Sequence, residues 1–408
     1  MIKRKKIVVM DAGLKEYGGH HPSILEVLSK SSYFREGEVC YEIYSNIAID
    51  DDLKEHLLKA GFSILPYFST DFYSNFYNYD SRLNYYNDYI IQLSKEYYFI
   101  LDSYKGRKVD FLHHTLNWDH AYALGLAISL FEKNNKDRVG EINHIVLLMF
   151  SPKANIYNEP IQAAKYKLGF RTLERCESVR IFSSDYELTE KYLSILSSDF
   201  GRYPCFLISE DKLNEVDKKK RSKSILLYLG DAKDNKGFNA LPSLIEEMIK
   251  EIVDDEVNFI LQYTITNDNK ILIDTDNKIK ALSISDNRIK VMPYFLSDLD
   301  MHDLWMRAEY IVFNYDCEVY RNQSSGVLWL AAAYRVNAYF MTDSWLNREA
   351  ERLGMNYSYG KNAKEITNKI KEDIEQSSCV TSLVSSLKCS EYREQLLSDF
   401  GRWLVREI

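Results

Sequence analysis

Short apolar runs alternate with longer segments of helical periodicity along most of the chain. Residues 6–10 (KIVVM) are apolar on both faces, which is typical of a buried parallel strand. A glycine-containing loop follows, and Pro22 stands near the first turn of a predicted helix. Strand alternating with helix over about 200 residues predicts a parallel, doubly wound sheet. Further strands of this half are predicted at residues 39–45, 62–68, 109–116, 144–150 and 179–185.

The same pattern restarts after a polar segment. Residues 209–224 (SEDKLNEVDKKKRSKS) are rich in charge and are predicted to form a linker. We expect an α/β fold of two facing Rossmann-like domains, residues 1–208 and 225–385, with a cleft between them. A last helix within residues 386–408 is expected to pack back on the first domain. The strands of the second half are predicted at residues 225–231, 257–264, 289–295, 309–315 and 336–342.

Composition narrows the class of protein. The chain has 408 residues, of which 46% are hydrophobic, and this fits two globular domains rather than a disordered chain. A net charge of -8 argues against a nucleic-acid-binding protein. Six cysteines without CxxC spacing indicate neither a zinc site nor a disulfide framework.

The N-terminal sequence MIKRKK precedes an apolar run that is too short for a signal peptide or a membrane span. We therefore expect a cytoplasmic protein. The basic run KKKRSK, residues 218–223, leaves open a peripheral contact with acidic lipids on the inner face of the membrane. A solvated linker is the alternative interpretation of that run.

A loop with two lysines follows the strand at residues 225–231. Gly230 lets the chain turn, and Gly237 opens the following helix. Lys233 and Lys236 stand between these glycines, and lysine supplies the mobile positive charge that a phosphate group needs. The alternative is a solvated loop with two surface lysines.

Residues 320–336 (YRNQSSGVLWLAAAYRV) place a polar cluster in front of an apolar helix. Ser324 is predicted to be the N-cap of this helix. The free N–H groups at Ser325 and Gly326, together with the helix dipole, also favour an anion. With the lysine loop, this helix end predicts a nucleotide-diphosphate site. Further donor-side candidates in the preceding loop are Tyr315, Tyr320 and Arg321.

These motifs resemble those of the GT-B glycosyltransferases, close to the retaining family 4 type. The family pattern G-x-x-R-x-x-K-G-F resembles residues 230–238 (GDAKDNKGF), with Lys233 in the place of Arg. Its Tyr-x-x-Arg-Ser-Ser-Gly-x-x-x-Glu-Ala pattern resembles residues 320–331, where Leu330 replaces the glutamate that bonds the nucleotide ribose in relatives. The glycine-and-histidine loop after the first strand is similar to Gly18, Gly19 and His20.

The resemblance implies transfer of a sugar, with retention, from a nucleotide-diphosphate sugar to a glycan or lipid-linked acceptor in bacterial surface polysaccharide assembly. Lys236 is then the predicted catalytic cation for the departing diphosphate, with Lys233, Arg321 and the helix-end amides beside it. Such a site requires no metal and no cofactor. Residues 298–300 (DLD) look like a metal-binding DxD motif, but they are predicted to cap a helix.

A polar cluster at the end of the strand at residues 109–116 is the predicted acceptor side. Histidines there can bond sugar hydroxyls or act as acid or base, although a structural role is the alternative for each. His114 and His120 are the predicted catalytic histidines, and His20 is a separate candidate near the phosphates or the acceptor. The predicted acceptor contacts are His113, Asn117 and Asp119.

Two other functions stay open at this point. Leu330 favours a GT-B-like binding or partner subunit without transfer activity, although Asp316 and Glu318 stand near enough in sequence to replace the missing glutamate. A nucleotide-sugar epimerase on the same architecture is the other alternative, because the lysine loop fits either enzyme.

Overall fold

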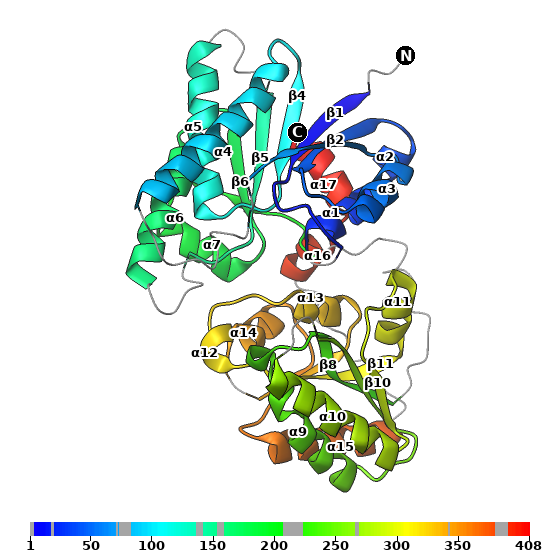
Figure 1. Cartoon of the computed structure of the whole chain (residues 1–408). Helices are drawn as coiled ribbons and strands as arrows, with labels where there is room; N and C mark the ends of the chain where they lie inside the picture. Colours follow the sequence, from blue (N-terminus) through cyan, green and yellow to red (C-terminus); the bar gives the residue numbers. More distant parts are fainter. Residues whose placement is uncertain are drawn as a thin grey trace. The chain divides into compact units, whose positions relative to one another are not determined.

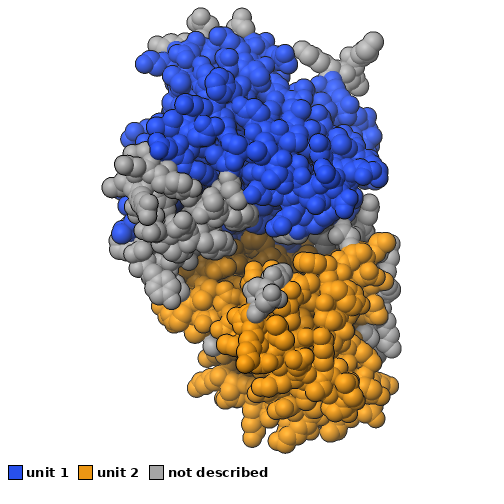
Figure 2. Space-filling view, in the orientation of Figure 1, with its two compact units in different colours: residues 1–209, 398–408 blue, residues 210–397 orange. Residues whose placement is uncertain are grey.

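The computed structural model describes residues 4–17, 20–70, 72, 83–135, 142–152, 159–206, 223–265, 269–341, 343–379 and 391–408. The chain divides into two compact units (Figure 2). Unit 1 comprises residues 1–209 and 398–408, and unit 2 comprises residues 210–397. Residues 209–222 of the predicted linker lie outside the described part of the chain.

Unit 1 is built on a parallel sheet whose strand order, among the described residues, is β3-β2-β1-β4-β5-β6-β7. The order reverses at β1, which pairs with β2 on one side and β4 on the other. Loops that leave β1 and β4 therefore diverge at the carboxyl edge, where open α/β sheets bind ligands. The strands are β1 (Lys5–Met10), β2 (Val39–Asn46), β3 (Ser63–Phe68), β4 (Val109–His113), β5 (Ile142–Leu148), β6 (Val179–Ser183) and β7 (Gly201–Arg202).

Helices cover both faces of this sheet (Figure 1). One face carries α1 (His20–Lys30), α2 (Ser32–Arg35), α3 (Asp51–Lys59) and α17 (Phe400–Glu407), and the other carries α4 (Leu83–Ser103), α5 (Trp118–Asn134) and α6 (Glu159–Glu174). The remaining helix is α7 (Tyr186–Leu193). Two glycines let α5 and α6 approach closely, because a Cβ on Gly169 would lie 2.2 Å from the Trp118 carbonyl oxygen. A Cβ on Gly125 would lie 2.9 Å from the Leu173 nitrogen.

Helix α17 belongs to unit 1, although it follows all of unit 2 in the sequence. It packs against α1 and α2, and Gly401 approaches α2 so closely that a Cβ there would lie 2.4 Å from the Ser31 hydroxyl. The Trp403 ring meets Phe182 of β6 edge-to-face at 4.9 Å. Arg180 pairs with Glu407 at 3.2 Å.

Unit 2 repeats the same architecture with the strand order β10-β9-β8-β11-β12-β13 among its described residues. Helices α9 (Leu241–Glu251), α10 (Lys270–Ser285) and α15 (Ala363–Cys379) pack on one face of the sheet. Helices α11 (Asp298–Arg307), α13 (Gly326–Ala333) and α14 (Trp345–Arg352) lie on the other face (Figure 1). The strands are β8 (Ser224–Asp231), β9 (Asn258–Thr264), β10 (Ile289–Met292), β11 (Ala308–Phe313), β12 (Asn337–Phe340) and β13 (Tyr357–Tyr359).

Short elements complete unit 2. Two 3-10 turns, η3 (Asp234–Lys236) and η4 (Phe238–Ala240), separate β8 from α9. Helix α12 (Cys317–Tyr320) follows β11, and α16 (Glu391–Leu397) precedes the return of the chain to unit 1.

The doubly wound parallel architecture predicted for both halves is confirmed. Every strand predicted from the sequence is present, with ends that differ by a few residues. The edge strands β7 and β13 were not predicted, because two or three residues are too short to show a periodicity. Among the described residues, no helix combines the length and the apolar character that crossing a membrane requires.

Candidate functional site

The loop after β8 in unit 2 is held by backbone contacts with the loop after β11. Gly237 has a φ of 73°, and a Cβ there would lie 1.8 Å from the Asn314 carbonyl oxygen. The Asn314 amide donates to the Gly237 carbonyl at 3.2 Å, and the Asp316 N–H donates to the Asn235 carbonyl at 2.9 Å. Glycine is therefore required at position 237, both for its left-handed conformation and for this close approach.

The two lysines of this loop differ in their surroundings. Lys233 is exposed, and its ammonium pairs with Asp231 at 3.2 Å. Lys236 is half-buried, and its Nζ lies 3.2 Å from the position that a Cβ on Gly230 would take. Within the described residues, the Lys236 ammonium makes no hydrogen bond and no ion pair. Burial, followed by the charge of Lys233, lowers its pKa.

Three tyrosines lie near this loop in the fold: Tyr228 belongs to β8, and Tyr315 and Tyr320 lie in the segment between β11 and α13. The Tyr228 hydroxyl donates to the Asp231 carbonyl at 2.6 Å and accepts from the Lys233 N–H at 3.0 Å. The rings of Tyr315 and Tyr320 lie 4.5 Å apart. Burial raises the pKa of all three tyrosines, so they are neutral hydrogen-bonding groups at physiological pH. Because β8 and β11 are neighbouring parallel strands, the lysine loop and the segment that leads from β11 to α13 start at the same carboxyl edge of the sheet.

Helix α13 begins at Gly326 and has Ser325 as its N-cap, without a side-chain capping bond. The prediction that Ser324 caps this helix is wrong, because the chain reaches the helical conformation one residue later. Gly326 is exposed, and a Cβ there would meet open space. Among the described residues, no hydrogen bond is made to the N–H groups of Gly326 and Val327.

The other candidates of unit 2 have partners of their own. Arg321 is exposed and follows α12 as its C-cap, and its guanidinium pairs with Glu318 of that helix at 2.6 Å. Asp316 caps α12 by accepting from two backbone N–H groups. Residues 298–300 lie in the first turn of α11, as predicted, but the cap of this helix is Ser297, whose hydroxyl accepts from the Asp300 N–H at 3.2 Å.

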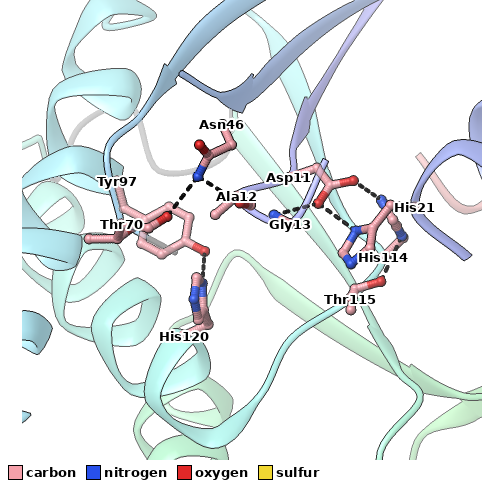
Figure 3. A network of polar contacts seen from close by, with 10 residues as sticks. All are labelled: Asp11, Ala12, Gly13, His21, Asn46, Thr70, Tyr97, His114, Thr115 and His120. Carbon is pink, nitrogen blue, oxygen red and sulfur yellow. Dashed lines mark hydrogen bonds and ion pairs between the residues drawn. The ribbon is translucent and has the colours of Figure 1, made fainter. Parts of the chain in front are cut away.

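In unit 1, a buried carboxylate joins two histidines at the carboxyl edge of the sheet (Figure 3). Asp11 directly follows β1, and its Oδ1 lies 2.7 Å from His21 Nδ1, whereas its Oδ2 lies 2.8 Å from His114 Nε2. The Gly13 N–H also donates to Oδ1 at 3.0 Å. Burial alone would raise the pKa of Asp11, but its interactions with His21 and His114 outweigh burial and hold the pKa well below its usual range. Asp11 is therefore a carboxylate at physiological pH.

This trio also has the residue types of a metal site, since one ligand atom from each lies within 4.8 Å of the others. His21 Nδ1 and His114 Nε2, however, lie at hydrogen-bond distance from different oxygens of the Asp11 carboxylate. Thr115 in turn bonds to His114 Nδ1 at 2.9 Å. We therefore describe Asp11, His21 and His114 as a hydrogen-bonded network and assign no metal to it.

The remaining histidines of this edge have different partners. His120 lies between two tyrosine hydroxyls, with Nε2 3.0 Å from Tyr89 and Nδ1 2.9 Å from Tyr97. His113 Nε2 faces His144 Nδ1 at 3.1 Å. Burial, followed by the nearby histidines, holds the pKa of His113 well below its usual range, so this ring is neutral at physiological pH. His113 and His120 are thus buried members of polar pairs, separate from the Asp11 network.

The first turn of α5 holds the other two predicted acceptor residues. Asn117 caps the helix by accepting from the Trp118 N–H. Asp119 is fully buried, and its Oδ2 has no hydrogen-bond partner among the described residues. Burial is the main cause that raises the pKa of Asp119 to about 7.

The glycine-and-histidine loop is described only in part. Gly18 and Gly19 lie outside the described residues. His20 opens α1, and its half-buried ring lies 4.5 Å from the ring of His21. Burial, followed by the charges of His21 and His114, lowers the pKa of His20 to about 3. His20 is therefore neutral at physiological pH.

Asp11 and His21 were not predicted as site residues from the sequence. Two signals were present: Asp11 is the first polar residue after an apolar strand, and His21 is the second histidine of the sequence GGHH. The contact between Asp11 and His114 could not be predicted from the sequence. It joins residues 103 positions apart and depends on β1 and β4 being neighbours.

Comparisons with known proteins establish the fold. No protein-family model matches the sequence, and no curated protein is similar to it in sequence. Solved structures that are similar include a glycosyltransferase from Rickettsia africae, with a TM-score of 0.60, 14% identity and coverage of 99% of this chain and 97% of that chain. A UDP-GlcNAc 2-epimerase from Neisseria meningitidis, bound to UDP-GlcNAc, has a TM-score of 0.59 and 13% identity, with 98% of each chain covered.

The Anabaena protein HepE, in complex with UDP-glucose, is also similar, with a TM-score of 0.59, 11% identity and 98% of each chain covered. Identities this low establish the fold alone. The chain thus consists of two Rossmann-like units with parallel sheets, the GT-B architecture that glycosyltransferases and UDP-GlcNAc 2-epimerases share.

Proposed function

We propose that this protein is a glycosyltransferase that binds a nucleotide-diphosphate sugar at the carboxyl edge of the unit 2 sheet and transfers the sugar to a glycan or glycoconjugate acceptor. The single observation that carries the proposal is Lys236. Its half-buried ammonium makes no hydrogen bond and no ion pair among the described residues, and the charge of Asp231 offsets only part of the effect of burial on its pKa. An anion bound beside Lys236 would form an ion pair with this ammonium and offset the cost of its burial.

Other features of the same edge support a diphosphate. The exposed start of α13 offers the N–H groups of Gly326 and Val327 and the positive end of the helix dipole. These donors and Lys236 would stabilise the charge that develops on a departing nucleoside diphosphate. Two of the similar structures contain UDP-GlcNAc or UDP-glucose, and this supports a UDP-sugar as the donor.

A nucleotide-sugar epimerase is the second candidate. The epimerase from Neisseria meningitidis is as similar in fold as the glycosyltransferase from Rickettsia africae, with TM-scores of 0.59 and 0.60. Both enzymes need the diphosphate contacts of unit 2, so these contacts alone favour neither. We place the transferase first because residues 230–238 and 320–331 of this chain resemble sequence motifs of the GT-B glycosyltransferases.

The test has two stages. Calorimetric titration with UDP, GDP and TDP measures nucleotide binding and selects the nucleotide. Turnover is then followed with UDP-glucose and UDP-GlcNAc, each with and without a panel of p-nitrophenyl glycosides as acceptors. Nucleotide release that requires an acceptor supports the transferase. Conversion of the donor sugar without an acceptor assigns an epimerase, and binding without either reaction assigns a GT-B-like binding subunit.

A further inference from the structure

A buried amide in unit 2 joins the end of β8 to the segment that follows β10. Gln262 stands near the carboxyl end of β9 and is 3% exposed. Its Oε1 accepts a hydrogen bond from the Gly230 N–H at 3.1 Å, and its Nε2 donates to the Tyr294 carbonyl at 2.8 Å. Since a backbone N–H can only donate and a carbonyl can only accept, these two partners fix the direction in which the amide points.

One of these partners, Gly230, is the residue beside which the Lys236 ammonium lies. Lys236 Nζ is 3.2 Å from the position that a Cβ on Gly230 would take. The φ of Gly230 is 105°, a backbone conformation that residues with a side chain rarely adopt. Because the Lys236 ammonium makes no hydrogen bond and no ion pair among the described residues, its position depends on the chain against which it packs. The hydrogen bond from Gln262 holds that chain in place.

The other partner, Tyr294, lies between β10 and α11. Strand β9 pairs in parallel with β10 on one side and with β8 on the other, so both hydrogen bonds of Gln262 are made at the carboxyl edge of the sheet. This is the edge at which we place the diphosphate. A single buried side chain therefore ties the turn at Gly230 to a second segment of the same edge, and its loss would release both.

Resting on the proposed diphosphate site of unit 2, we infer that Gln262 is a positioning residue, which holds Gly230 so that the Lys236 ammonium stands where the diphosphate binds. Gln262 does not contact the ligand, because it is buried and its amide is engaged by the backbone at both ends. Displacement of a binding group by about 1 Å can cost about 10²-fold in rate. The contribution of Gln262 is made through Lys236, so it should disappear when Lys236 is absent.

A double-mutant cycle on the full chain tests this inference, with the affinity for UDP measured by calorimetry. Gln262→Met removes both hydrogen bonds but keeps the length of the side chain. We expect it to raise the Kd for UDP about tenfold when Lys236 is present. In the Lys236→Ala background the same substitution should raise the Kd by less than about twofold. A residue that only supports the fold would give equal losses in the two backgrounds.

Tyr263→Phe is the matched control for the loss of a buried hydrogen bond in β9. Tyr263 follows Gln262 in the strand, so its side chain points to the opposite face of the sheet. Its buried hydroxyl donates to Asp276 of α10 at 2.6 Å. We expect Tyr263→Phe to lower the urea concentration at which the protein unfolds, but to leave the Kd for UDP within about twofold of wild type.

The outcomes separate this inference from the proposed function. Equal losses of UDP affinity with and without Lys236, or wild-type affinity in Gln262→Met, overturn the inference and leave the diphosphate site standing. A wild-type protein that binds neither UDP nor inorganic pyrophosphate overturns both. Because the cycle measures binding alone, it decides the role of Gln262 whether or not sugar is transferred. If Gln262→Met does not fold, Gln262→Asn takes its place, since it keeps a buried amide that is one methylene too short to reach both partners.

Discussion

Replacing Lys236 by alanine tests the proposed diphosphate site most directly, because binding and stability should respond in opposite ways. Lys236 is half-buried, and its ammonium makes no hydrogen bond and no ion pair among the described residues. Two unit charges about 4 Å apart interact by roughly 4 kcal/mol at the effective dielectric constant of such a site. Mutations that remove one contact to a developing charge cost about 2.7–4 kcal/mol. We therefore expect Lys236→Ala to lower kcat/KM by about 100- to 700-fold, at about 1.4 kcal/mol per tenfold change.

Stability should not fall in the same variant. Burial lowers the pKa of Lys236, so below that pKa the folded protein bears the cost of a charged, partly desolvated ammonium. This cost disappears only as the pH rises past the folded pKa toward the ordinary value of 10.5. The alanine variant should accordingly unfold in urea at pH 7.5 at the same or a higher urea concentration than wild type.

Two comparisons make this result decisive. Lys233→Ala removes an exposed lysine that is already paired with Asp231, so its loss should cost less than about 1 kcal/mol of affinity. Lys250→Ala on α9 is the neutral control, since this exposed lysine pairs with Glu251. Calorimetry with UDP and steady-state kinetics measure all three variants. Wild-type affinity and turnover in Lys236→Ala would refute the reasoning, and so would a loss of affinity matched by an equal loss of stability.

The remaining predictions concern stability, each measured by urea unfolding. Gly237→Ala should lower the free energy of unfolding more than Gly37→Ala does. Both glycines have a left-handed φ, but a Cβ at Gly37 meets nothing within 4 Å, whereas one at Gly237 meets the Asn314 carbonyl. Equal losses of stability would contradict this. The raised pKa of Asp119 makes the wild-type free energy of unfolding fall as the pH rises from about 4 to about 7, and Asp119→Asn should remove that fall. Identical pH profiles would show that Asp119 is not the group responsible. Tyr392→Phe should cost about 1–3 kcal/mol, because the Tyr392 hydroxyl donates to the buried Glu349 carboxylate at 2.7 Å; a neutral effect would show that another donor replaces it.

The fold and the lysine loop were predictable because their signals are local. The buried strand at residues 6–10 is apolar on both faces, and this pattern has few structural interpretations. Gly230, Lys236 and Gly237 stand within eight consecutive residues, so a single strand-to-helix turn is enough to bring them to one edge of the sheet.

The Asp11 network depends instead on the order of the strands. Asp11 and His114 are 103 positions apart, and they meet only because β1 pairs with β4. The sequence indicates that strands exist, but it does not indicate which strands are neighbours. The predicted Ser324 cap was one residue away from the N-cap position, which Ser325 occupies without a side-chain capping bond. Two adjacent serines satisfy the same capping preference, so the sequence alone does not choose between them.

The place of α17 in unit 1 has a consequence for biosynthesis. On the ribosome, residues 400–407 are made after the whole of unit 2, so unit 1 cannot acquire its contacts with α1, α2 and Phe182 until then. The first two hundred residues therefore leave the ribosome before one helix of unit 1 has been made. The apolar surface that α17 covers stays exposed while unit 2 is translated. A nascent chain stalled after unit 2 should consequently be more sensitive to protease in unit 1 than the finished chain.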